Sequence, residues 1–129
     1  RSVIPGRSRG SISFTPVIGA PLSAVQPLSS GLGAEARNNG LVIVNALNGD
    51  SDHILKGYFS AFSDVDTTTV AFVWDVLDNN GTRLHRIRGQ QAVQGSADDP
   101  WSVVGADVMQ TIAASTIRDY LAWRANART

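Results

Sequence analysis

The sequence predicts an α+β fold, a two-layer sandwich in which a mostly antiparallel β-sheet carries two helices on one face, in the order β-α-β-β-β-β-α. Three observations carry this prediction. Residues 68–90 alternate apolar and polar side chains around an Asn80-Gly81 turn, which is typical of a β-hairpin. Apolar residues recur at three- and four-residue steps in residues 23–37 and 100–127, which indicates two amphipathic helices. Short aliphatic runs between turn residues supply the remaining strands.

The chain of 129 residues has the size of one domain. Residues 1–11 combine glycine, proline, serine and arginine without an apolar period, so we expect a flexible linker there and a single domain over residues 12–129. Because the chain begins with Arg1 instead of methionine, we expect a processed or trimmed form, with any signal peptide or lipidated cysteine upstream.

The first strand begins at Ile12 and ends at a Gly-Ala-Pro break, and the first helix follows. The helix starts either with a capping box between Ser23 and Gln26 or with Pro27 in its first turn. It stops at residues 38–40, Asn-Asn-Gly. The apolar stripe of this helix is Val25, Leu28, Leu32 and Ala36.

Gly31 and Gly33 fall inside this predicted helix, where each costs roughly 1 kcal/mol relative to alanine. We therefore expect either a short helix packed closely against the sheet or an irregular helix at this point. A nucleotide-binding loop is not indicated, because no third glycine follows at the required step.

The middle of the chain supplies two more strands. Residues 41–46 are mostly β-branched and aliphatic, which predicts a central strand buried on both faces. Residues 54–62 form a strand with alternating faces and a bend near Gly57.

The hairpin of residues 68–90 can be assigned face by face. A two-residue type I′ turn at Asn80-Gly81 fixes which residues lie opposite each other. The expected pairs are Asp78 with Arg83, Asp75 with Arg86, and Trp74 with Ile87. One face is therefore apolar, and the other exposes paired charges to water.

The last helix is predicted over residues 100–127, with Asp99 as its cap and Pro100 in the first helical position. Its apolar face should lie on the sheet. This face consists of Val104, Val108, Ile112, Thr116, Tyr120 and Trp123.

Composition excludes several classes of function. The formal net charge is zero, which removes the general attraction on which nucleic-acid-binding proteins depend, so we expect no nucleic-acid partner. Cysteine is absent, which excludes a disulfide framework, a thiolate nucleophile and a zinc knuckle. No run approaches the ~18 apolar residues that span a bilayer.

No group of residues has the pattern of a catalytic, cofactor or metal site, so we expect no enzyme. His53 lies in an Asp-rich turn without a second histidine at ligand spacing, and a solvated turn is expected. His85 is expected to be a packed structural residue, because no G-x-S-x-G nucleophile accompanies it. The tryptophans Trp74, Trp101 and Trp123 fall on predicted buried faces and are expected in the core.

Arg83, Arg86 and Arg88 are the candidate partner-binding residues. Two of them have carboxylates across the hairpin, and exposed ion pairs of that kind typically stabilise the fold by less than ~1 kcal/mol. Arg88 has no such partner, so it is a candidate contact to a partner protein, a carboxylate or a phosphate. A solvated strand face is the alternative.

The sequence resembles a class of small Gram-negative envelope lipoproteins of uncharacterised function. The carrying segments are SFTPVIGAPLSAVQPLSSGLGAEARNNGLVIV, DHILKGYFSAF, TTVAFVWDVLDNNGTRLHRIRG, and DPW with the last helix. Their order is similar to periplasmic α/β modules of the curli-secretion lipoprotein, the transport-auxiliary lipoproteins and the N-terminal domain of the Tol translocation protein.

The resemblance implies a non-enzymatic periplasmic domain, anchored to the outer membrane through a lipid outside this chain. Such a domain would bind another envelope component, as an accessory to a transport or assembly system, through a sheet edge or the arginine-bearing face. The alternative is a carrier of a small ligand or lipid in an apolar cavity between helices and sheet.

Overall fold

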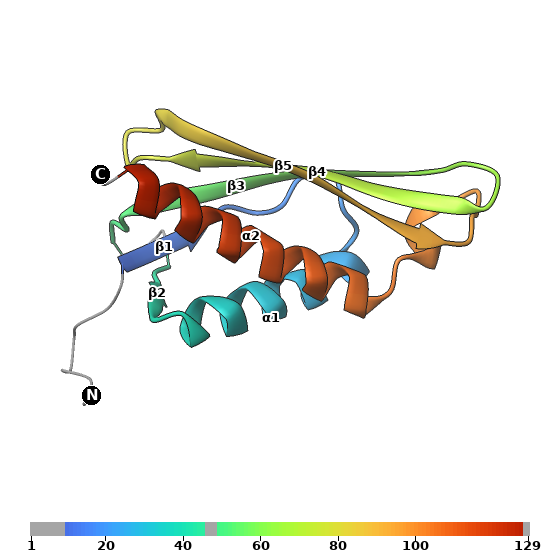
Figure 1. Ribbon diagram of the computed structural model, residues 1–129, viewed down its shortest axis with the longest axis horizontal. Coiled ribbons are helices and arrows are strands. Elements are labelled where there is room, and N and C mark those ends of the chain that lie inside the picture. The colour runs from blue at the N-terminus through green and yellow to red at the C-terminus, as the bar shows by residue number, and fades with distance from the viewer. Residues whose placement is uncertain (1–9, 46–48, 128–129) are drawn as a thin grey trace.

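The computed structural model describes residues 10–45 and 49–127, and it confirms the predicted order of elements (Figure 1). The strands are β1 (Gly10–Phe14), β2 (Leu41–Ile43), β3 (His53–Ser63), β4 (Thr67–Leu77) and β5 (Arg83–Gln94). The helices are α1 (Leu22–Asn38), the 3-10 helix η1 (Pro100–Val103) and α2 (Ala106–Ala127). Both α-helices lie on one face of the sheet, so the fold is the predicted two-layer α+β sandwich.

The predicted linker, residues 1–11, lies mostly outside the described residues. Its last two residues, Gly10 and Ser11, already belong to β1, where they pair with β2. No helix within residues 10–45 and 49–127 is long and apolar enough to cross a membrane.

The sheet has the strand order β2-β1-β3-β4-β5. β1 is parallel to both of its neighbours, whereas the long strands β3, β4 and β5 are antiparallel. The prediction of a central strand over residues 41–46 is wrong, because β2 is a three-residue strand at the sheet edge. Val42 and Ile43 are 49% and 40% exposed there. β1 takes the inner position instead, since it pairs with β2 on one side and β3 on the other.

The hydrophobic core fills the space between the sheet and the two helices. The alternation predicted for the hairpin is confirmed, because Val70, Phe72, Trp74 and Val76 all face the helices and are buried. The helices contribute buried residues at three- and four-residue spacing. These are Ala24, Leu28, Leu32 and Ala36 from α1, and Met109, Ile112, Ala113, Thr116, Ile117 and Tyr120 from α2.

The β4–β5 turn is one residue longer than the sequence indicates. The Gly81 N–H donates to the Asp78 carbonyl at 3.0 Å, and Gly81 has a φ of 86°, so residues 79–81 form a three-residue loop. The Asp78 carboxylate accepts hydrogen bonds from the backbone N–H groups of Asn80 and Thr82. The predicted pair of Asp78 with Arg83 is therefore wrong.

A β-bulge compensates for this longer turn. Val76 lies opposite His85 but Leu77 lies opposite Arg83, so Leu84 is the extra residue of β5. Beyond the bulge the register is as predicted, with Asp75 opposite Arg86 and Trp74 opposite Ile87.

The C-terminal helical segment is interrupted, in contrast to the prediction of one helix over residues 100–127. Asp99 is the predicted cap, and its carboxylate accepts from the Trp101 N–H at 3.2 Å. The resulting turn, η1, ends before an extended Val104, and α2 starts after Gly105. At the start of α1 no side chain caps the helix, so the predicted capping box does not form.

Candidate functional site

The three arginines predicted to bind a partner lie on one surface, the face of the sheet opposite the helices. The bulge at Leu84 is the reason, because strict alternation would turn Arg83 to the same side as the buried Ile87. We call this surface the Arg-bearing face, and it consists of Lys56, Asp75, Arg83, Arg86 and Arg88. Since β5 is an edge strand, the arginines also follow a sheet edge.

Asp75 fixes one of these arginines. Its carboxylate accepts from Arg86 Nε at 2.6 Å and from Arg86 Nη2 at 3.0 Å, a bidentate pair. Arg83 Nη1 lies 4.0 Å from the same carboxylate. The hydrogen bonds from Arg86, with the nearby charges of Arg86, Arg83 and Lys56, hold the pKa of Asp75 below its usual value against the opposing effect of burial.

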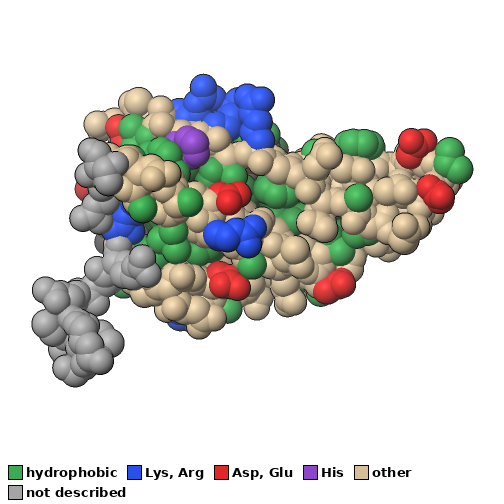
Figure 2. Space-filling model, in the orientation of Figure 1, with side chains coloured by type: hydrophobic (Ala, Val, Ile, Leu, Met, Phe, Trp, Pro, Cys, Tyr) green, Lys and Arg blue, Asp and Glu red, His purple; other side chains and the backbone are tan. Residues whose placement is uncertain are grey.

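The Arg-bearing face has an excess of positive charge. Among the outward-facing side chains of β3, β4 and β5, all of them in the described part of the chain, four are cations and Asp75 is the only carboxylate. The local charge is therefore +3 at pH 7, although the formal net charge of the chain is zero. Figure 2 shows basic side chains gathered beside a histidine along the upper side of the molecule.

Arg88 is the exposed cation that the sequence leaves without a partner. Within residues 10–45 and 49–127 no carboxylate lies within ion-pair distance of it. Beside it, a shallow depression of about 430 Å³ is lined by the outward side chains of Tyr58, Ser60, Ala71 and Val73. A cation next to a small apolar depression can hold a carboxylate and an adjoining apolar group at once.

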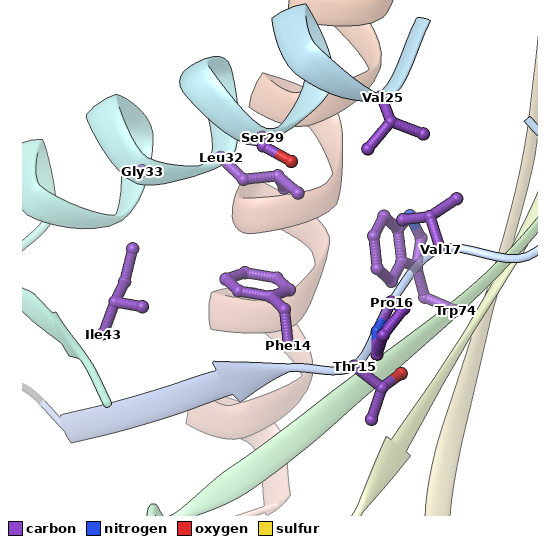
Figure 3. Close-up of a pocket in the computed structure, with 10 residues that line it drawn as sticks. All are labelled: Phe14, Thr15, Pro16, Val17, Val25, Ser29, Leu32, Gly33, Ile43 and Trp74. Atoms are coloured by element: carbon purple, nitrogen blue, oxygen red, sulfur yellow. The ribbon is translucent and has the colours of Figure 1, made fainter. Parts of the chain in front are cut away.

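A second hollow lies inside the sandwich, between α1 and the β1–α1 connection (Figure 3). It is a cavity of about 430 Å³, and most of its walls are apolar. The lining residues are Phe14, Thr15, Pro16, Val17, Val25, Ser29, Leu32, Gly33, Ile43 and Trp74. Such a volume is within the range of small-molecule sites, about 300–1,000 Å³.

Two polar atoms in the lining of this cavity have no hydrogen-bond partner among the described residues. They are Nε1 of Trp74 and Oγ1 of Thr15. Trp74 is 0% exposed, so its indole N–H has lost water without gaining an acceptor. Buried donors without an acceptor are rare in proteins, because the hydration they lose is costly.

The two histidines are packed among aromatic side chains. His53 opens β3 instead of lying in a solvated turn, and its Nδ1 is 2.6 Å from Tyr120 Oη. His85 is stacked on Trp123 with ring centroids 5.2 Å apart, which confirms the prediction of a packed residue. No group of three metal-ligating side chains occurs in the described residues. Trp74 is in the core as predicted, while Trp101 and Trp123 are half-buried against it.

The alternative function expected from the sequence includes an apolar cavity between helices and sheet, but the residues that line this cavity were not identified. Phe14, Val17 and Ile43 appear in the sequence as ordinary strand residues, and nothing in their spacing shows that they leave a space below α1. The only sequence signal was the pair Gly31 and Gly33, of which Gly33 lines the cavity.

Comparison with known proteins gives likenesses of fold. No protein-family model matches the sequence, and no curated protein sequence matches it. A dodecameric PelC from Paraburkholderia phytofirmans is 20% identical, with a TM-score of 0.53 over 88% of this chain and 91% of that one. An uncharacterised protein is 12% identical, with a TM-score of 0.55 over 85% of this chain and 91% of that one. Lipoprotein GNA1162 from Neisseria meningitidis is 13% identical, with a TM-score of 0.47 over 86% of this chain and 96% of that one.

Proposed function

We propose that this chain is a non-enzymatic binding domain of the bacterial cell envelope, and that it holds an acidic surface of another envelope component against the Arg-bearing face. The observation that carries the proposal is the local charge of +3 on one face of a chain whose net charge is zero. Charge concentrated in this way attracts an acidic partner and orients it during the encounter.

The arrangement of the arginines supports docking at this face. The hydrogen bonds to Asp75 fix the Arg86 side chain in place. The Arg83 side chain is 52% exposed, and Arg88 lies beside the depression, so both can contact a partner. A guanidinium binds a carboxylate with two parallel hydrogen bonds, which favours Arg over Lys where orientation matters.

The packing of the histidines supports a non-enzymatic role. His53 is engaged by Tyr120, and His85 lies flat against Trp123. The Ser51 hydroxyl donates to the backbone carbonyl of His53 at 2.8 Å, and no Ser or Thr hydroxyl in the described part of the chain is hydrogen-bonded to either imidazole ring.

The envelope location rests on the resemblance of four segments to envelope lipoproteins. The fold shared with PelC, which forms a dodecamer, supports assembly with other copies or other proteins. We place the domain in the periplasm, attached to the outer membrane by a lipid outside this chain. Metabolic labelling of the full-length protein with palmitate, followed by membrane fractionation, tests this, and an unlabelled protein in the soluble fraction contradicts it.

Site-specific photocrosslinking tests the binding face. A photoreactive residue at Gln90, exposed on β5 beside Arg88, should give a discrete adduct in cells of the source organism. The adduct should disappear when Arg83→Glu and Arg88→Glu are combined, because the face then loses its excess positive charge. It should persist with Arg118→Glu on the exposed side of α2. An adduct that survives the double reversal, or that forms equally from position 110 on α2, contradicts the proposal.

A further inference from the structure

We propose that the cavity under α1 binds a neutral, mainly apolar molecule that carries an oxygen acceptor, such as the acyl ester of a lipid, and that Trp74 donates a hydrogen bond to this oxygen. The site is separate from the Arg-bearing face, because its lining comes from α1, β2, the β1–α1 connection and the helix side of β4.

The charge of the ligand follows from the walls. None of the residues that line the cavity is charged. Six of them have hydrocarbon side chains: Phe14, Pro16, Val17, Val25, Leu32 and Ile43. An ion placed there would lose its hydration without finding a counter-charge, which is costly. A neutral molecule with a hydrocarbon part fits these walls.

The oxygen acceptor follows from Trp74. The indole Nε1 is a donor only, it is fully buried, and no acceptor in the described residues reaches it. Figure 3 shows the Trp74 ring beside Phe14, Val17 and Val25. A carbonyl or ether oxygen supplied by the ligand would satisfy this N–H.

The cavity is held open by the backbone around it. The β1–α1 connection is fixed to β3 by hydrogen bonds from Thr15 N–H to the Leu55 carbonyl at 3.1 Å and from Ile18 N–H to the Gly57 carbonyl at 3.0 Å. The Phe59 N–H in turn donates to the Ile18 carbonyl at 2.8 Å. This connection therefore cannot move onto α1 and close the space without losing hydrogen bonds.

The size of the ligand follows from the volume. The cavity of about 430 Å³ lies in the lower part of the range of small-molecule sites, about 300–1,000 Å³. A small molecule such as a monoacylglycerol with an eight-carbon chain suits a site in this range. Ser29 and Ile43, both exposed, mark the side from which it enters.

The test is displacement of a neutral fluorescent probe, N-phenyl-1-naphthylamine, by monooctanoylglycerol, by octanoate at pH 8 and by butylbenzene, which has no oxygen. We expect the glycerol ester to bind at least tenfold more tightly than octanoate. Trp74→Phe should lower the affinity for the ester by about fivefold, which is the contribution of one neutral hydrogen bond. The affinity for butylbenzene should stay unchanged. Trp101→Phe, the same substitution outside the cavity, should change neither affinity.

A second pair of variants tests the location with exposed residues only. Ser29→Phe obstructs the entrance to the cavity and should lower the affinity for the ester more than tenfold. Ser30 is the next residue and does not line the cavity, so Ser30→Phe should bind the ester as the wild type does. Circular dichroism checks that each variant is folded. The proposal is overturned if the ester does not displace the probe, if Ser29→Phe binds normally, or if folded Trp74→Phe loses no preference for the ester. The combined Arg83→Glu and Arg88→Glu variant should bind the ester normally, which separates this site from the partner-binding face.

Discussion

His53 is surrounded in a way that favours its neutral form. Its ring makes edge contacts with Tyr120 and Trp123, at centroid distances of 5.5 Å and 5.1 Å. Burial lowers the pKa of His53, the charge of Asp52 opposes this shift, and the charge of Arg124 adds to it. Burial also raises the pKa of Tyr120 to about 12, so its hydroxyl is protonated at neutral pH and can donate to His53 Nδ1.

This environment predicts a pH-dependent stability. Because the folded pKa of His53 lies below its unfolded value of about 6.5, the unfolded state binds more protons in the interval between them. The free energy of unfolding is therefore greatest above about pH 6.5 and falls as the pH drops through that value. Thermal unfolding between pH 7.5 and 5.5 should show a falling Tm in the wild type and a flatter profile in His53→Gln. An unchanged slope in His53→Gln would refute the assignment.

Gly57 shows why a single missing Cβ matters. It lies opposite Trp74 in the β3–β4 register, and a Cβ there would be 2.7 Å from the Trp74 ring, which is fully buried. Gly57→Ala should therefore lower the free energy of unfolding by about 1–3 kcal/mol in urea titrations. Ser60→Ala, on the exposed side of the same strand, should stay within about 0.5 kcal/mol. Equal stability of the two variants would show that the indole has room to shift.

At the scale of elements, the contact between α1 and α2 depends on Gly31, one of the two glycines of α1. A Cβ on Gly31 would be 2.9 Å from the Cβ of Ala113, so Gly31 allows the helices to approach closely. The expectation of a short helix packed closely against the sheet, or of an irregular helix, is therefore wrong, because α1 runs through both glycines as one helix of 17 residues and Gly31 faces α2. A Cβ on Gly33 would meet only the flexible end of Arg37, at 3.2 Å.

The two glycines therefore make a matched pair of variants. Gly33→Ala should raise the free energy of unfolding by about 0.5–1 kcal/mol, because alanine is the better helix former. Gly31→Ala gains the same helix propensity but forces the helices apart, and it should lower stability by about 1–2 kcal/mol. Urea denaturation of both variants measures the difference. Stabilisation by both substitutions would mean that α2 can move without cost.

The elements also show what a periodic pattern reveals. Alternation placed the inward residues of β3 and β4 correctly, because side-chain direction in a strand depends on the local backbone alone. It gave the wrong place for β2, since an apolar run indicates burial but not which strand it pairs with. It also missed the three-residue turn, where the Asp78 carboxylate binds backbone N–H groups that a two-residue turn would not present.

The same limit applies to the candidate sites. Asp75 and Arg86 were paired correctly from the hairpin register. Arg83 reaches the same face only because of the bulge at Leu84, which follows from the turn and not from the strand pattern. The cavity depends on how α1, β1 and β4 meet in three dimensions, so the missing partner of Trp74 Nε1 had no sequence signal.

At the scale of the whole molecule, a neutral chain has its charges separated. The Arg-bearing face lies near one end of β4, and the other end of β4 follows a turn with Asp64, Asp66 and the 88%-exposed Val65. At about 3.4 Å per residue, Asp66 and Asp75 are roughly 30 Å apart along the strand. Figure 2 shows acidic and hydrophobic side chains together at this far end.

This separation predicts association of copies head to tail. The acidic β3–β4 turn of one copy complements the Arg-bearing face of the next, and such heterologous contacts close into rings when the rotation between copies allows it. We expect light scattering to give a mass that rises with protein concentration at low salt and returns to one chain at 0.5 M NaCl.

Charge reversal locates the contact. The combined Arg83→Glu and Arg88→Glu variant, and separately the combined Asp64→Lys and Asp66→Lys variant, should each stay monomeric at low salt, because each then presents like charges to its neighbour. Mixing the two should restore association, because every contact between unlike variants then joins surfaces of opposite charge. Arg118→Glu, on the exposed side of α2, should associate as the wild type does. A mass that does not respond to salt, or a mixture that stays monomeric, would mean that the acidic surface bound by this face belongs to a different protein.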